Sequence, residues 1–389
     1  MSYYNLPKIY SLKDIKINPT VKSDEIKLYT SQSLYNYYND CIKQLCRCLV
    51  ESKMTISNIS KDINPYEYIF SIIPGYNFSV SKLKSKSSVF YDFLEIFNTL
   101  NVFDNFINKS INCIHISKNY LDSVESIELL RENKIDENLC FEEIHDDIFN
   151  DINEKRYDFI FYEIENTHLN DLNNLNEYVV DFIKIVMIIF KYQKNNGNCL
   201  IKIGHVFHKP IIDILYILSS MYEKIYIIKP NTSNIITFEK YIVCKNFLLN
   251  ETNNEYYKDN YFRLAQFISN YSIGINTNIS KIIDCEIPYY FINKIDDMNI
   301  IIGQQQLESI DQIINIFKNK NKEDKIESFR KTNIQKSINW CEKFKIPFNR
   351  FSEKPNIFLP LKNDQDKEYN ENECKEDEDK EDEDKEEEL

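Results

Sequence analysis

Four charged side chains stand where the sequence could support proton chemistry. Lys202 lies in an apolar run at 198–203, where a lysine either reaches the end of a strand or belongs to an active site. Glu163 stands near the end of another apolar run, and Glu239 precedes a third. Asp92 lies in a segment with helical periodicity, where a solvated position is the simplest interpretation. Side chains of these types serve as general acids and bases.

Histidine and cysteine residues give weaker signals. His205 and His208 are three residues apart, a spacing that can bind a metal on a helix, but no cysteine or acid completes a set. We expect them to be surface or capping histidines. Cys41, Cys46 and Cys48 lack Cys-x-x-Cys spacing and a second pair downstream, so free thiols are favoured over zinc ligands. No metal site is predicted.

The order of strands and helices predicts how the charged residues are positioned. Apolar runs predict strands at 112–117, 157–164, 198–203, 223–229 and 238–247, with helices between them at 121–133, 173–193 and 210–221. This alternation is typical of an α/β fold with a mostly parallel sheet and helices on both faces. The last strand follows a loop too short for a crossover helix, so we expect it to be antiparallel, at or near an edge.

Helical additions flank this α/β region. Helical periodicity is also found at 31–51, 82–106, 255–268, 304–317 and 326–344, and the last of these contains Trp340, the single tryptophan. The predicted divisions are an irregular and helical region at 1–80, the α/β domain at 81–250, a helical extension at 251–362 and a disordered acidic tail at 363–389.

Four segments of the α/β region form a recognisable set: SKSSVFYDFLEI at 85–96, DFIFYE at 158–163, GNCLIKI at 197–203 and KPNTSNIITFEKYIVCKNF at 229–247. Together they resemble the FtsJ-like RNA ribose 2'-O-methyltransferases, nearest the cap methyltransferases of large DNA viruses. The last segment is the most specific, because Lys-Pro, Ser, Glu, Tyr and Cys keep near-family order and spacing. The resemblance implies a Rossmann-like methyltransferase fold.

The resemblance also implies a catalytic set of four residues, which the family has in the order Lys, Asp, Lys, Glu. This chain has Asp92, Glu163, Lys202 and Glu239 at those positions. In the family, the second lysine deprotonates or orients the ribose 2'-hydroxyl, and the others position it and tune its pKa. We expect Lys202 and Glu163 at the carboxyl ends of neighbouring strands, with Glu239 within roughly 4 Å of Lys202 if the set survives.

Two of these positions depart from the family pattern. Glu163 is one methylene longer than the family's aspartate, and Asp92 replaces a cation by an anion. Three carboxylates around one ammonium raise the pKa of Lys202, whereas a general base at neutral pH needs a lowered pKa. Lys84 or Lys86 would supply the missing cation if the helix register differs.

The methyl donor implied by the resemblance is S-adenosylmethionine, whose binding in this fold needs a glycine-rich turn after the first strand. The chain has five glycines, none of them between residues 76 and 196, and the turn at 118–122 reads KNYLD. The chain from there to Asp158 is short for the two strands that the family has. Asp146 or Asp147 could match the family's adenine-side acid. We expect weak or no cofactor binding.

Charge is concentrated at one end of the chain. Of the net charge of -14, residues 364–389 contribute -12, from 16 acidic and 4 basic residues, which leaves about -2 for the rest. Bulk charge therefore does not demand nucleic acid. RNA remains a possible partner through lysines near the presumed site: Lys82, Lys84, Lys86, Lys109, Lys118 and Lys209.

The acidic tail or the C-terminal helices could instead bind a protein. No signal peptide or membrane span is expected, which favours a reducing, cytoplasmic location with free thiols. Two functions stay open from the sequence. One is an RNA ribose 2'-O-methyltransferase of doubtful activity, favoured by Lys202 and Glu239. The other is a catalytically inactive RNA-binding or scaffold subunit, favoured by the turn without glycine.

Overall fold

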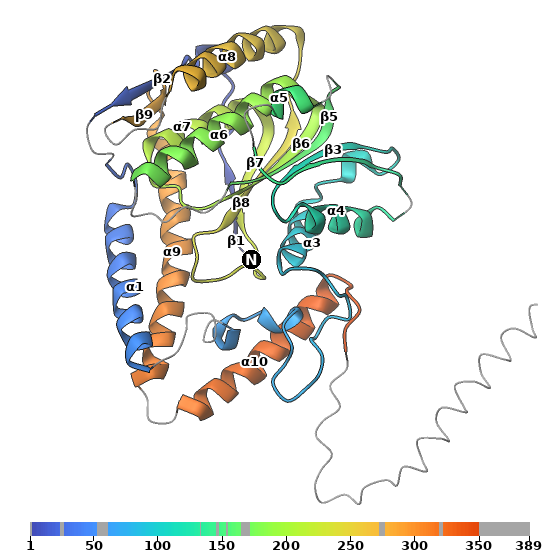
Figure 1. Ribbon diagram of the computed structural model, residues 1–389, viewed down its shortest axis with the longest axis vertical. Coiled ribbons are helices and arrows are strands. Elements are labelled where there is room, and N and C mark those ends of the chain that lie inside the picture. Colours follow the sequence, from blue (N-terminus) through green and yellow to red (C-terminus); the bar gives the residue numbers. More distant parts are fainter. Residues whose placement is uncertain are drawn as a thin grey trace, which may run out of the picture. The chain divides into compact units, whose positions relative to one another are not determined.

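A seven-stranded sheet forms the centre of the computed structural model (Figure 1). The structure describes residues 2–23, 27–52, 61–132, 134–144, 148–152, 155–164, 172–271, 277–318 and 322–349. The strands of this sheet are β1 (Ser2–Leu6), β3 (Asn112–Ile116), β4 (Glu137–Phe141), β5 (Tyr157–Glu163), β6 (Gln193–Ile203), β7 (Tyr222–Lys229) and β8 (Lys240–Phe247). The strand order is β1-β7-β8-β6-β5-β3-β4.

The pairing of the strands confirms the mostly parallel sheet. β3 is parallel to β4 and β5, and β5 is parallel to β6. β8 is antiparallel to β6 and β7, as expected for the last strand. Its expected position at or near an edge is wrong, because the loop after β7 returns the chain into the sheet between β6 and β7. β1 then covers the outer edge of β7 in antiparallel register.

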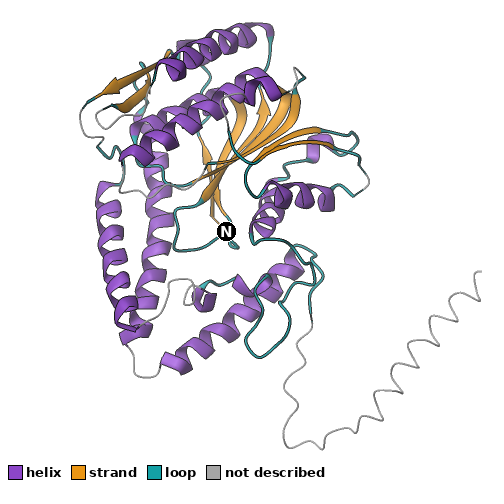
Figure 2. Cartoon of the chain, in the orientation of Figure 1, coloured by secondary structure: helices purple, strands orange, loops and turns teal. Residues whose placement is uncertain are grey.

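Helices cover both faces of the sheet, and Figures 1 and 2 show the layers. The helices are α1 (Gln32–Ser52), α3 (Val89–Leu100), α4 (Tyr120–Leu130), α5 (Ile148–Asp151), α6 (Leu172–Tyr192), α7 (Lys209–Met221), α8 (Glu251–Asn270), α9 (Tyr289–Lys318) and α10 (Lys322–Lys343). Short 3₁₀ turns occur at η1 (Leu12–Asp14), η2 (Glu67–Ile69) and η3 (Asp104–Phe106).

Alternate side chains of each strand enter different cores, as the two-residue period of a strand requires. Phe159 and Phe161 of β5 pack with Phe93 of α3 in one core. Ile160 and Tyr162 enter the larger core, which α6, α7 and α8 share. Both faces of β5 are therefore buried, which explains its continuous apolar run.

The expected helix at 82–106 is shorter in the structure. α3 begins at Val89 and ends before Asn101, which takes the left-handed conformation with φ of 50°. Asparagine tolerates this conformation better than most residues do, and it commonly ends a helix. Lys245 of β8 then donates to the carbonyls of Leu100 and Asn101, which satisfies acceptors at the helix end.

The two additions contain strands as well as helices. β2 (Ile17–Lys22) pairs antiparallel with β9 (Asn278–Ile283), so a segment before the α/β region and one after it form a second, two-stranded sheet. α1 packs along α9, and α10 contacts η2. Residues Met1–Phe348 form one compact unit, and the predicted acidic tail at 363–389 lies outside the described residues.

Candidate active site

The ends of three strands bring the predicted site residues together. Glu163 ends β5 and lies opposite Lys202 of β6 in parallel register, so both side chains stand at the carboxyl ends of neighbouring strands, as expected. Glu239 directly precedes β8, whose amino-terminal end pairs with the end of β6 because these strands are antiparallel. In open α/β sheets, ligands bind at the carboxyl ends of the strands.

Lys202 lies between two carboxylates. Its Nζ is 2.7 Å from Oε1 of Glu163 and 3.9 Å from Oε1 of Glu239. The second distance agrees with the roughly 4 Å expected from the sequence. The side chain of Lys202 is 9% exposed, so solvent screens these ion pairs less than it screens surface pairs.

The electrostatics of the cluster keep Lys202 charged. Burial by itself lowers the pKa of Lys202, but the attraction of Glu163 and Glu239 outweighs burial, and the pKa is raised above its ordinary value. The pKa of Glu163 is lowered, because Lys202 outweighs the effect of burial on that carboxyl. At neutral pH, Lys202 is therefore an ammonium that can orient an oxygen but does not accept a proton.

Asp92 is buried, and the expectation of a solvated helix residue is wrong. Its carboxyl accepts hydrogen bonds from the hydroxyl of Thr232 and, at 2.9 Å, from that of Tyr241. Burial raises the pKa of Asp92 from 3.8 to about 7, although both hydrogen bonds and the charge of Lys202 oppose the rise. α3 therefore contributes a carboxyl group at the position where the family resemblance implies a lysine.

A second buried lysine lies close to the cluster, and sequence reasoning did not assign it a role. Lys229 donates to the carbonyls of Asn234, Thr237 and Glu239 at 2.8 to 2.9 Å. Burial lowers its pKa to about 8 despite the attraction of nearby carboxylates. The Lys-Pro pair of the family motif was the available signal. Lys86 does not replace the missing cation at Asp92, because it precedes α3 and pairs with Glu125 at 3.7 Å.

A cavity of about 450 Å³ opens beside the cluster at the ends of β3, β4 and β5. Its lining includes Lys118 and six carboxylate side chains: Glu142, Glu143, Glu163, Glu177, Asp181 and Glu239. Glu142 and Glu143 directly follow β4, which the sequence analysis did not predict as a strand. Asp146 and Asp147, the expected adenine-side acids, lie outside the described residues.

The turn after β3 uses its hydrogen-bond donors internally. The hydroxyl of Ser117 donates to Glu163, and the backbone N–H of Asn119 donates to the Ser117 hydroxyl at 2.9 Å. The Asn119 side chain also hydrogen-bonds Glu163 and helps to lower its pKa. Glu163 thus takes the donors that a ligand carboxylate would need. The residues of this turn and the acidic lining do not fit the carboxylate end of S-adenosylmethionine.

Two other predicted features are placed differently from expectation. His205 and His208 are 4% and 6% exposed, so they are core residues and not surface histidines, and burial lowers the pKa of each ring. Both histidines lie in the loop between the end of β6 and the start of α7. The aromatic rings of Tyr178 and Phe207 pack on His205. Lys109 lies at the opposite end of the sheet from Lys202, where it pairs with Asp158 at 3.6 Å.

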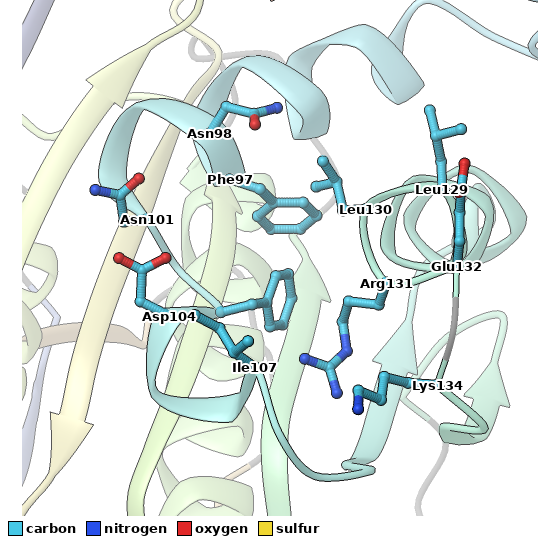
Figure 3. A pocket seen from close by; sticks show the side chains of 11 residues that line it. Phe97, Asn98, Asn101, Asp104, Ile107, Leu129, Leu130, Arg131, Glu132 and Lys134 are labelled. Atoms are coloured by element: carbon cyan, nitrogen blue, oxygen red, sulfur yellow. The ribbon is translucent and has the colours of Figure 1, made fainter.

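Another cavity, of about 380 Å³, lies between the carboxyl ends of α3 and α4 (Figure 3). Arg131 lines it, but the guanidinium is held by Asp136 at 2.6 Å and by the carbonyls of Phe106 and Lys109. This cavity is at the amino-terminal ends of β3 and β4, away from Lys202. The guanidinium of Arg131 therefore has a structural role, and Lys134 is the other cation of the lining.

The sheet order and the charged cluster at its carboxyl edge define a Rossmann-like α/β domain of the methyltransferase type. Residues 103–247 match the family model described as FtsJ-like methyltransferase. A solved structure described as a ribosomal RNA methyltransferase, from Plasmodium falciparum, is 16% identical over 43% of this chain and 100% of that chain, with a TM-score of 0.34. Comparison with curated proteins found no match. No helix among the described residues has the length and apolar character that a membrane span requires.

Proposed function

We propose that this protein binds RNA at the Lys202 site and has little methyl-transfer activity at neutral pH. One observation carries the proposal: the carboxylate of Glu163 is bonded both to Lys202 and to the turn after β3. The same side chain keeps Lys202 protonated and takes the hydrogen-bond donors of the turn. The FtsJ-like domain supports RNA as the partner.

The charges of the cluster determine which part of an RNA can reach Lys202. Phosphates are repelled by the six carboxylates of the cavity, so they would lie outside it. A ribose hydroxyl has no charge and can reach Lys202, whose ammonium donates a hydrogen bond to the hydroxyl oxygen. Lys202, Glu163, Glu239 and Asp92 would then position a ribose without removing its proton.

The test is a pair of titrations on the whole chain. Isothermal titration with S-adenosylmethionine is expected to show binding weaker than about 1 mM, or roughly -4 kcal/mol. Fluorescence anisotropy with capped and uncapped single-stranded RNA is expected to show binding that weakens steeply with salt. Micromolar affinity for S-adenosylmethionine would refute the proposal that the protein has little methyl-transfer activity. Absence of RNA binding would refute the proposal that it binds RNA.

An active ribose 2'-O-methyltransferase is the second candidate, and it is favoured by the meeting of Lys202, Glu163 and Glu239 at the strand ends, as the family resemblance implies. In that case, Lys202→Ala should abolish methyl transfer and leave cofactor affinity nearly unchanged, because the lysine faces the ribose. Activity should also increase with pH. The pKa of Lys202 is raised, so its neutral amine, the form that can accept a proton, becomes populated only as the pH approaches that pKa. A methyl-transfer assay between about pH 7 and 10 separates the two candidates.

A further inference from the structure

A smaller cavity, of about 200 Å³, is lined in part by the loop that joins β7 to β8 and ends at Glu239. The FtsJ-like segment and both additions contribute to its walls. The lining includes Pro65, Tyr66, Pro230, Asn231, Ser233 and Gln305. Cavities for drug-sized ligands begin near 300 Å³, so this one has room for a single small ring system.

The loop between β7 and β8 connects this cavity to the Lys202 site. Lys229, which also lines the cavity, donates to the carbonyl of Glu239 at 2.9 Å. Thr232, in the same loop, donates to Asp92. The loop that lines the second cavity therefore also bonds Asp92 and the backbone of Glu239 at the first site.

The donors of the lining argue against a phosphate as the ligand. Lys229 is the single cation among the described lining residues, and its ammonium donates to three backbone carbonyls. An ammonium has three hydrogens, so these bonds use all of them. A phosphate in this cavity would meet no available charged donor.

The remaining walls fit a flat, uncharged ring with polar edges. Tyr66, Pro65, Pro230 and Ile235 provide aromatic and apolar surface, and Asn231 and Gln305 add uncharged amide side chains to the lining. Proteins that bind single-stranded RNA stack unpaired bases on aromatic side chains and bond their edges. We propose that this cavity binds one nucleobase of an RNA whose neighbouring ribose lies at Lys202. This inference rests on the proposed RNA-binding function.

Trp340 provides a reporter for this cavity. Its indole Nε1 donates to Oε2 of Glu95 at 3.1 Å, and the same oxygen accepts from the backbone N–H of Asn231 at 3.1 Å. Burial raises the pKa of the Tyr66 phenol, and the negative charge of Glu95 raises it further. A ligand between Tyr66 and Asn231 is thus one carboxylate away from the single tryptophan of the chain.

The experiment is a titration of Trp340 fluorescence with the four nucleoside 5'-monophosphates, without any methyl donor. At least one nucleotide should change the emission in a saturable way, and ribose 5-phosphate should not. Tyr66→Leu should weaken the affinity for that nucleotide, and for single-stranded RNA, about tenfold, as loss of base stacking does. Tyr37→Leu, at a 61% exposed tyrosine of α1, is the matched control and should change neither.

Asn231→Phe supplies a second variant, because the larger side chain fills the cavity while its backbone N–H can still bond Glu95. It should block the nucleotide response. A response to ribose 5-phosphate equal to that of the nucleotides, or affinities unaffected by both variants, would overturn the proposal. If the protein transfers methyl groups and both variants keep the wild-type affinity for nucleotide and RNA, the proposed base site is wrong, but the RNA-binding function is not. Nucleotide binding in the absence of methyl transfer would support the base site, because this binding does not require an active methyltransferase.

Discussion

The buried carboxyl of Asp92 makes the stability of the protein depend on pH, and Asp92→Asn should remove this dependence. Asparagine has nearly the same shape and can keep bonds to both partners, because the hydroxyls of Thr232 and Tyr241 can donate or accept. The substitution therefore removes a titrating group and leaves the packing of α3 against β8 in place.

The size of the effect follows from the pKa of Asp92 in the two states. The pKa is about 7 in the folded protein and 3.8 without the fold, so the folded state binds the proton more tightly. The resulting stabilisation is complete below about pH 3.8 and is lost as the pH rises through 7. At 1.36 kcal/mol for each pKa unit, the total is about 4 kcal/mol, of which about 3 kcal/mol falls between pH 5 and pH 8.

Urea unfolding of the wild type and of Asp92→Asn at about pH 5, 6, 7 and 8 measures this difference. The free energy of unfolding of the wild type should fall relative to that of the variant as the pH rises, by about 3 kcal/mol across the series. Asp311→Asn, on the exposed side of α9, is the control and should follow the wild type. Parallel curves for the wild type and Asp92→Asn would refute the reasoning, since they would show that the carboxyl is ionised in the folded protein across this pH range.

Three further predictions concern the charged cluster and the backbone. Lys202→Met should lower the free energy of unfolding by about 3 kcal/mol in urea, because it leaves a buried carboxylate without its cation; adding Glu163→Gln should recover part of the loss, and no recovery would count against the ion pair. Glu163→Asp should strengthen S-adenosylmethionine binding in isothermal titration, because a shorter side chain releases the turn after β3; unchanged affinity would show that the turn is blocked by other groups. Gly197→Ala should cost about 3 kcal/mol in thermal or urea unfolding, because its Cβ would lie 2.8 Å from one backbone oxygen and 3.0 Å from another. Gly303→Ala, where the nearest atoms to the Cβ would belong to the side chain of Leu34 and not to the backbone, should cost less, and equal costs would contradict this explanation.

The interior strands of the sheet could be predicted because both of their faces are buried. β5 is an unbroken apolar run, and its boundaries agree with the prediction to within a residue. β4 and β1 were not predicted, because they are the two edge strands of the sheet. The residues of β4 are exposed or half-buried, so this strand lacks the continuous apolar run of β5. β2 and β9 were missed because each is defined by a partner more than 250 residues away.

The candidate site was predictable where the motif residues follow the strand ends. Lys202, Glu163 and Glu239 meet because the register of β5, β6 and β8 brings them together. The burial of Asp92 could not be read from its own helix, because it depends on Tyr241, which is 149 residues away in the chain. The acidic cavity wall was missed with β4, whose carboxyl end positions Glu142.

The position of β1 in the sheet has a consequence for the order of synthesis. Leu6 of β1 and Tyr222 of β7 are separated by 216 residues, so the strand leaves the ribosome long before its partner exists. At about 5–20 residues per second, the delay is about 10–40 s. During this time β1 has no sheet edge to join, while β3, β5 and β6 are made in sequence and can pair. The outer edge of β7 is therefore closed by the first strand of the sheet to be translated, and an error in its return would leave that edge open to another chain.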